Sequence, residues 1–408
     1  MLQVGGRGNT DGPRGSRVRA VLVSLEVALS TVLLIGAGLL LTSLQRILNV
    51  PRGFATQNVV GIDLRLSDAT YRTADQQCSF YRRVLEGVSS IPGVLQLGYS
   101  EALPLSQSWY GFQIAREGSS EYRSLWHTAS PGDWAFASKV SSGYFQTLGI
   151  PLHDGRLFAD DGEKELVAVV SESAARKTWP GENPIGKRFR RDPEQRWTRV
   201  IGIVGDTRVR TLGRDAQATV YFPYFQFGGP QINLLVRTAL DPAVLTRSIR
   251  DEVSKIDRAV ALPEIRTMAS IVSRAVAPRR FQAVLVTSFA LLALILASIG
   301  IFGVVSYVVL QRRAEIGVRV ALGANPRDVC SLMLRQGMWP VVLGLGAGIL
   351  MAAALTRLMT GLLFEVRALD PATFVAAPLF LGIVAVAACY LPARQASQID
   401  AVEALRYQ

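Results

Sequence analysis

The chain has 408 residues, of which 49% are hydrophobic and only 19% are charged, and its mean hydropathy is +0.26. Soluble domains carry about 25% charged residues, so this composition excludes a disordered chain and argues against a purely soluble one. Three cysteines (Cys78, Cys330, Cys389) and two histidines (His127, His153) are too few and too scattered for a disulfide framework or a His-rich metal centre. We therefore expect neither a metal nor a cofactor.

The net charge of +12 comes from 44 Lys and Arg against 32 Asp and Glu, and its distribution is uneven. Residues 1–19 hold four arginines against Asp11, and residues 311–337 hold five arginines against Glu315 and Asp328. Both segments border long apolar runs. Basic residues beside apolar runs mark the cytoplasmic side of membrane spans, so we expect a membrane protein and no nucleic-acid partner.

Four apolar runs are long enough to cross a bilayer, which takes about 20 residues. They are Ala20–Leu41, Ala283–Leu310, Met338–Leu355 with its extension to Phe364, and Pro371–Ala393. The predicted organisation is a cytoplasmic tail (1–19), helix 1 (20–44), an extracytoplasmic domain (45–280), helix 2 (281–310), a cytoplasmic segment (311–337), helix 3 (338–364), an outer loop (365–370), helix 4 (371–393) and a cytoplasmic tail (394–408).

The first span has the basic front of a signal peptide, but its apolar run is longer than a signal core and no small-x-small cleavage site follows Leu39. We interpret it as an uncleaved anchor. Glu26 lies in its inner part, where a carboxylate is expensive. Two interpretations are open for Glu26: a polar contact at a helix interface or at the headgroups, or a relay or substrate role. In the third span, the Gly344-x-x-x-Gly348 spacing favours close helix packing in lipid.

Residues 42–282 alternate short β-like runs with helical patterns, which predicts a mixed α+β domain of two lobes. Two helices are expected, at Thr73–Ser89 and at Pro242–Ile256, the second with Asp241 as N-cap and proline at its first position. The expected strands are Val59–Leu66, Val94–Ser100, Leu166–Val170, Val200–Val204 and Ile232–Val236.

Gly181–Lys187 matches a phosphate-binding loop except that Arg188 replaces the Ser or Thr that holds magnesium. A turn, not the required helix, is expected after it, so we interpret the match as accidental. The nearby arginines are expected to form a solvated face. Motifs of serine hydrolases and zinc proteases are absent from the sequence. We therefore expect no catalytic residues in this domain.

Residues 311–328 carry the most informative pattern. Glu315 and Arg319 are four residues apart in the acid-first order that favours a helical pair. Gly323 suits a helix end, and Asn325–Pro326 suits the start of the next helix. The pattern predicts a short amphipathic helix on the cytoplasmic face, which can bind lipid headgroups or dock into a partner's groove.

These residues also resemble a known family. Glu315–Ala324 resembles the signature of FtsX-like permeases, and Leu391–Ala396 with Ala404–Arg406 resembles their tail. Phe158–Phe189 is similar to the MacB-type periplasmic core domain, as are Val204–Arg208, Tyr221–Tyr224 and Val236–Thr238. The resemblance covers nearly the whole chain. It departs at Ile399–Ala401, where the family usually has Asp-Pro.

The resemblance implies the permease subunit of an ABC-type transporter in the inner membrane, with its large domain in the periplasm and a function in export or efflux. A separate cytoplasmic ATPase would move the Ala314–Leu322 coupling helix, and the spans would relay this motion outward (mechanotransmission). The residues that the family motif assigns to ATPase coupling are Arg313, Glu315, Ile316, Gly317, Arg319, Ala321, Leu322, Gly323 and Ala324.

Implied partners are that ATPase, a second permease in a homodimer or a heterodimer, and a periplasmic adaptor. The chain is closest to one half of the acidobacterial-type duplicated orphan permeases, and the single copy leaves the oligomeric unit open. An alternative is a regulatory FtsX-like subunit that switches an extracytoplasmic hydrolase or lipoprotein partner. A membrane-anchored enzyme would require a catalytic constellation outside, which the sequence does not offer.

Overall fold

The computed structural model describes residues 13–67, 69–106, 108–118, 134–159, 163–191, 196–260, 265–311, 326–358, 366–367 and 369–397. The chain divides into two compact units. We call residues 50–277 the ectodomain, and the residues before 50 and after 277 the membrane unit.

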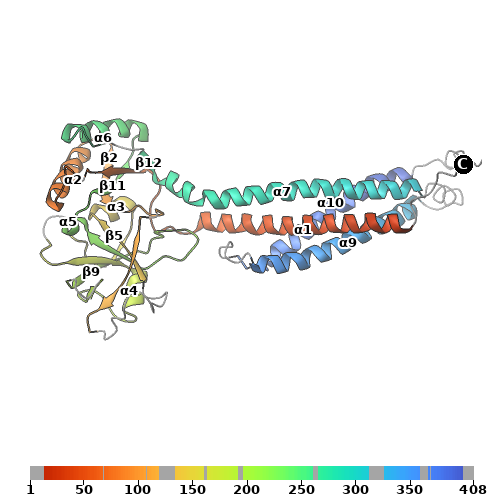
Figure 1. Ribbon diagram of the computed structural model, residues 1–408, viewed down its shortest axis with the longest axis horizontal. Helices are drawn as coiled ribbons and strands as arrows, with labels where there is room; N and C mark the ends of the chain where they lie inside the picture. Colours follow the sequence, from red (N-terminus) through yellow and green to blue (C-terminus); the bar gives the residue numbers. More distant parts are fainter. Residues whose placement is uncertain are drawn as a thin grey trace, which may run out of the picture. The chain divides into compact units, whose positions relative to one another are not determined.

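The described part of the membrane unit is built from long helices (Figure 1), all four of them apolar enough to cross a bilayer. The predicted spans 20–44, 281–310 and 371–393 lie within three of these helices, and residues 338–358 of the predicted third span lie in the fourth. Residues 359–364 of that span lie outside the described residues. The helices are α1 (Pro13–Asn49), α7 (Met268–Gln311), α9 (Pro326–Leu358) and α10 (Pro371–Ser397).

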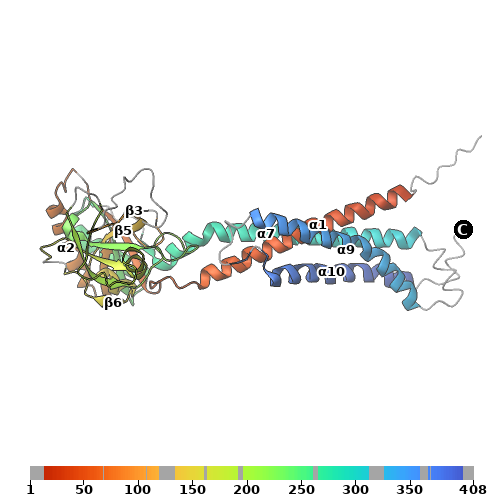
Figure 2. The same ribbon diagram turned by 90° about the horizontal axis from the view of Figure 1, so that it is seen from below.

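The helix α7 begins well before residue 281, where the second span was predicted to start, and it continues through Pro278 as one long helix (Figure 2). A proline inside a helix removes one backbone hydrogen bond but need not end it. The first turns are supported by packing, because Met268, Val272 and Val276 recur at helical spacing and are all buried. Local sequence could not show this support.

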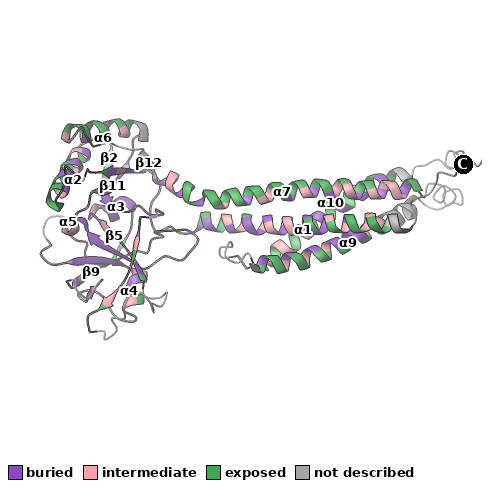
Figure 3. Cartoon of the chain, viewed as in Figure 1, coloured by how far each residue is buried: buried purple, intermediate pink, exposed green. Residues whose placement is uncertain are grey.

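Apolar side chains occupy both the inside and the outside of the membrane unit. Val27, Ala297 and Ala385 are fully buried, whereas Leu350 is 74% exposed and Phe281 is 67% exposed. Figure 3 shows buried and exposed residues alternating along each helix. Such exposure would be a liability in water, but hydrocarbon solvates these side chains in a bilayer.

One mixed sheet runs through the ectodomain in the order β12-β1-β11-β2-β5-β10-β7-β9-β8-β4, with β3 paired to β5 and β6 to β9. The helices and strands of the ectodomain are β1 (Val59–Arg65), α2 (Ala74–Ser89), β2 (Val94–Ser100), β3 (Tyr110–Gln113), β4 (Ala115–Arg116), β5 (Trp134–Val140), α3 (Gly143–Leu148), β6 (Leu152–Gly155), β7 (Val167–Ser171), α4 (Glu172–Thr178), β8 (Arg188–Arg190), β9 (Thr198–Val204), β10 (Thr219–Pro223), α5 (Tyr224–Phe227), β11 (Gln231–Thr238), α6 (Pro242–Ile256) and β12 (Ile265–Thr267).

The first half of the sheet is antiparallel and carries α2 and α6. Alternate residues of β1, such as Ile62 and Leu64, enter a core that also takes Phe80 and Val84 of α2 and Ile249 of α6. A capping box between Thr73 and Gln76 starts α2, because each side chain accepts a hydrogen bond from the other residue's backbone N–H. These two helices confirm the sequence predictions.

The second half of the sheet contains the parallel pairs β5–β10 and β7–β9 and has a core of its own, which includes Val170, Val200 and Phe222. β2 and β5 join the two halves through a single residue pair, Ser100 with Val140. Separate cores agree with the two lobes expected from the sequence, although one sheet runs through both.

All five predicted strands are present: β2 has the predicted bounds, and the ends of β1, β7, β9 and β11 differ from the predicted ones by at most two residues. The strands β5 and β10, which pair with each other in the centre of the sheet, were not predicted from the sequence. β10 is short and ends in Pro223, a residue that disfavours a central strand. The ladder tolerates this proline because it is the last residue of the strand.

Candidate functional site

The predicted coupling segment lies outside the described residues, which resume at 326. Its helix, its Glu315–Arg319 pair and its Gly323 end stay predictions. The structure places what flanks it: α7 ends at Gln311, and α9 begins at Pro326, the first-position proline that the sequence predicted.

Near its end at Gln311, α7 contacts α1. The guanidinium carbon of Arg19 lies 3.8 Å from the centroid of the Tyr307 ring, in the geometry of a cation–π interaction. The Tyr307 hydroxyl accepts a hydrogen bond of 2.8 Å from Gln311 Nε2. The last described turn of α7 is therefore tied to α1.

Two glycines of α9 lie against α1 with almost no space between the backbones. A Cβ on Gly344 would lie 2.5 Å from the carbonyl oxygen of Ser24, and one on Gly348 would lie 2.6 Å from Thr31 Cβ. A Cβ on Gly346 would meet nothing within 4 Å. This geometry suits the predicted packing role of Gly344 and Gly348, while their contribution to stability stays a prediction.

Serines in α1 add polar contacts between the membrane helices, which the sequence analysis missed. Ser24 Oγ lies 2.9 Å from the carbonyl oxygen of Pro340 in α9, and Ser30 Oγ lies 3.0 Å from that of Ala293 in α7. Each hydroxyl shares its single proton with the carbonyl four residues earlier in α1, at 2.9 Å for Ser24 and 2.8 Å for Ser30. The feature of the sequence that could have indicated these contacts is the presence of small hydroxyl residues within the apolar run of α1.

The Gly181–Lys187 loop does not have the form of a phosphate site. The backbone N–H groups of Ile185, Gly186 and Lys187 all donate to oxygen atoms of the protein itself, and Lys187 pairs with Glu182. The strand β8 follows the loop, not the helix that a phosphate site needs. The turn expected from residue 190 onward is therefore wrong for Arg190, which lies in β8; residues 192–195 lie outside the described residues.

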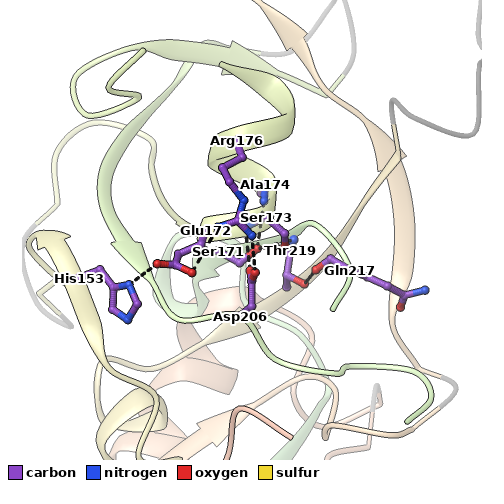
Figure 4. Close-up of polar contacts among 9 residues, drawn as sticks. All are labelled: His153, Ser171, Glu172, Ser173, Ala174, Arg176, Asp206, Gln217 and Thr219. Atoms are coloured by element: carbon purple, nitrogen blue, oxygen red, sulfur yellow. Dashed lines mark hydrogen bonds and ion pairs between the residues drawn. The ribbon is translucent and has the colours of Figure 1, made fainter. Parts of the chain in front are cut away.

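A polar cluster surrounds the start of α4 (Figure 4). His153 Nδ1 lies 2.5 Å from Glu172 Oε1, and Asp206 accepts hydrogen bonds from the Ser173 N–H at 2.7 Å and from Arg176 at 3.0 Å. Among the described residues, Glu172 is the only side chain that bonds to His153. Because neither nearby serine reaches the imidazole, the cluster joins loops to α4 and lacks a nucleophile–base pair.

A cavity of about 650 Å³ opens beside β8 and β9, with Arg196, Trp197 and Arg199 in its wall. The two glutamates in the wall of the cavity form ion pairs: Glu165 pairs with Arg199 at 3.1 Å, and Glu163 pairs with Arg156 at 2.5 Å. The hydrogen bond from Arg156 lowers the pKa of Glu163. Within the described part of the chain, no group of three or more His, Cys, Asp or Glu could hold a metal ion.

The described structure thus defines a class: a multi-pass membrane protein with one large α/β domain inserted between its first and second spans. Two family models match the chain. The MacB-like periplasmic core domain matches residues 27–256, which is more than half of the chain, and the FtsX-like permease C-terminal domain matches residues 287–401. The chain belongs to the MacB/FtsX-like permease family. It is accordingly a multi-pass inner-membrane protein with a periplasmic ectodomain.

Curated relatives carry the name macrolide export ATP-binding/permease protein MacB. The protein of Acinetobacter baylyi is 28% identical over 279 residues, which cover 65% of this chain and 41% of the relative. One from Paracoccus denitrificans is 30% identical over 297 residues, which cover 66% of this chain and 41% of the relative. The chain thus spans about two fifths of the length of these relatives.

Solved structures of similar domains cover the ectodomain. The periplasmic region of MacB from Actinobacillus actinomycetemcomitans has 19% sequence identity and a TM-score of 0.37, covering 56% of this chain and 97% of that one. The extracellular domain of the noncanonic ABC-type transporter YknZ from Gram-positive bacteria has 17% identity and a TM-score of 0.31, covering 51% of this chain and all of that one.

Proposed function

We propose that the chain is the permease subunit of an ABC-type exporter that transmits ATPase motion across the inner membrane to its periplasmic domain. The observation that carries this proposal is the joint match to a permease domain and a periplasmic core domain on one chain. The matched relatives are named for export, which favours an exporter over a regulatory subunit.

The chain's connectivity suits such a relay. Asn49 at the end of α1 is followed directly by the ectodomain, and α7 leads from the ectodomain back through the membrane. The segment between α7 and α9 carries the family signature and is basic, so it faces the cytoplasm where an ATPase acts. A movement of this segment would therefore act directly on α7.

ATP hydrolysis is proposed to belong to a separate cytoplasmic ATPase subunit. Support comes from the Gly181–Lys187 loop, whose amides are already engaged and whose domain is periplasmic. Two permease chains, alike or related, would pair with two ATPase subunits. A periplasmic adaptor is the proposed further partner of the ectodomain.

The test is uncoupling by substitutions in the coupling segment. Glu315→Ala removes one member of the predicted helical pair, which would be worth about 0.3–0.5 kcal/mol at an exposed position, so folding should be nearly unchanged. Gly323→Val puts a β-branched residue where a left-handed helix end is predicted. Both variants should insert normally but fail to co-purify with the ATPase or to stimulate it in reconstituted membranes.

Wild-type assembly and stimulation in both variants would contradict the coupling role and leave the helix as an interfacial anchor. Orientation is tested separately. In a background without native cysteines, a cysteine at position 323 should resist an impermeant thiol reagent in intact cells, because the segment is cytoplasmic. Co-purification of a hydrolase instead of an adaptor would favour the regulatory alternative.

A further inference from the structure

α1 and α7 meet in the membrane unit at three polar points, which we call the α1–α7 seam. From the cytoplasmic side they are Arg19 with Tyr307, Glu26 with Gly300, and Ser30 with the Ala293 carbonyl. Arg19 and Glu26 are seven residues apart, as are Tyr307 and Gly300. The first two contacts are therefore two helical turns apart on each helix, which is the matched spacing expected for antiparallel neighbours.

The central contact depends on the missing side chain of Gly300. The Glu26 carboxyl carbon lies 3.3 Å from the position that a Cβ on Gly300 would take, and its Oε2 atom lies closer still. The three atoms nearest to that position all belong to the carboxyl group of Glu26. One turn along the same helix, a Cβ on Gly303 would meet nothing within 4 Å. The absence of a side chain at Gly300 thus leaves a gap on α7, which we call the Gly300 notch, and the carboxyl group of Glu26 fills it.

Within the described part of the membrane unit, no ion pair of this carboxyl group is found. α7 carries no charged residue between 281 and 311, and α10 carries none between 371 and 393. On α9, the residues packed against α1 at this level are glycines and apolar side chains around Gly344. Arg19 lies two turns away and stacks on Tyr307. A carboxyl group at this depth is costly, so an ion pair does not account for its position.

We propose that Glu26 is a positioning residue, which by seating in the Gly300 notch sets the register of α1 against α7. This inference rests on the proposed function, because these two helices lead to and from the ectodomain and would carry its motion. A slip of one helical turn, about 5.4 Å, would remove all three seam contacts together. The size and shape of the side chain matter here, and its charge does not.

The register can be measured without any partner protein. α1 and α7 also approach each other away from the seam, where a Cβ on Gly36 would lie 3.9 Å from Val286 Cγ1. In a cysteine-free background, Gly36→Cys with Val286→Cys therefore reports the observed register without altering a seam residue. Gly36→Cys with Ala290→Cys or with Gln282→Cys reports a slip of one turn in either direction. A short bifunctional thiol reagent is applied to membranes that contain the full chain. Wild-type Glu26 should give the 36–286 product and little of the two slipped products.

Glu26→Ala and Gly300→Val should each lose the 36–286 product and gain one of the slipped products. Glu26→Gln, which keeps the size and shape of the side chain, should behave as the wild type does, and so should the matched control Gly303→Val. The double variant Glu26→Ala/Gly300→Val should regain the 36–286 product, because the valine fills the space that the shortened residue 26 leaves.

An unchanged 36–286 yield in Glu26→Ala would overturn the proposal, as would equal losses in Gly300→Val and Gly303→Val. Loss in Glu26→Gln would show that charge sets the contact, which also contradicts it. ATPase stimulation is measured in the same variants. If the register shifts in the Glu26 variants while Glu315→Ala and Gly323→Val leave coupling to the ATPase intact, the seam is supported and the proposed function is rejected. The seam and the proposed function can therefore fail independently.

Discussion

The ectodomain and the membrane unit use the same apolar residue types in opposite ways. In the ectodomain, aromatic side chains such as Phe145 and Tyr221 lie fully inside, edge to face at 5.1 Å between ring centroids. In the membrane unit, Leu296 and Phe289 are more than half exposed, and the contacts between helices are made by glycines, serines and small apolar residues. Burial from water holds the first region together, whereas close packing and backbone hydrogen bonds hold the second.

Glycine nevertheless has one role in both regions, since it allows two backbones to approach. In the ectodomain, a Cβ on Gly98 of β2 would lie 2.5 Å from the backbone nitrogen of Tyr144 in α3. In the membrane unit, Gly344 has the corresponding relation to Ser24. The two regions differ in the interaction that brings the backbones together, which is burial from water in the ectodomain and close packing in the membrane unit. The following predictions test that difference.

The largest effect is expected from a large-to-small change in the ectodomain. Phe145→Ala should lower the free energy of unfolding by about 3–5 kcal/mol, because it leaves a cavity among packed rings. Leu296→Ala in α7 is the control and should have almost no effect, since lipid already contacts that side chain. Denaturant unfolding of the ectodomain, followed by near-ultraviolet circular dichroism, measures the first variant, and unfolding of the membrane unit in mixed micelles with increasing SDS measures the second. Equal losses would refute the contrast between the regions.

A smaller effect is expected from filling the α1–α9 contact. Gly344→Val should destabilise the membrane unit by about 1–3 kcal/mol, because the added atoms collide with α1 backbone that cannot move aside. Gly346→Val is the matched control, with open space around it. Unfolding in mixed micelles with increasing SDS compares the two. If Gly346→Val costs as much, helix propensity and not packing explains the result.

The next effect is electrostatic and lies in the ectodomain. Glu163 has a pKa below its usual 4.5, chiefly because Arg156 donates hydrogen bonds to it, so it stabilises the fold above that pH and loses this contribution as the pH falls through its lowered value. Arg156 is half exposed, so Arg156→Gln should cost only about 0.2–1 kcal/mol at neutral pH. The gap between variant and wild type should close below pH 4.5. A gap that persists in acid would point to lost packing.

The smallest effect is expected at Lys187, which forms an exposed ion pair with Glu182. Lys187→Ala should change the free energy of unfolding by less than about 0.5 kcal/mol and should leave ATPase activity driven by the partner unchanged. Reconstituted vesicles with and without the ATPase provide the measurement. Abolished nucleotide binding in this variant would show that the Gly181–Lys187 loop is a phosphate site after all.

Two features of the candidate region that lie among the described residues could be inferred from local patterns, whereas the coupling residues 313–324 stay predictions. Pro326 begins α9 as predicted, and the spacing of Gly344 and Gly348 pointed to a packed helix face that the structure places against α1. The seam was not predictable. Glu26 stood out only as a costly carboxylate, and nothing in the sequence links it to Gly300, which lies 274 positions away. A contact between helices depends on rotation and register, which no short window of sequence contains.

The sequence by itself determined the spans, their orientation, and those helices and strands whose apolar residues recur regularly, because run length, arginine asymmetry and periodicity are all local properties. Only the tertiary structure decided that β11 lies between β1 and β2, that β10 runs parallel to β5, and that α7 continues through Pro278. Each of these depends on burial or hydrogen bonding between residues far apart in the chain. Such partners become neighbours only when the whole unit closes around its core.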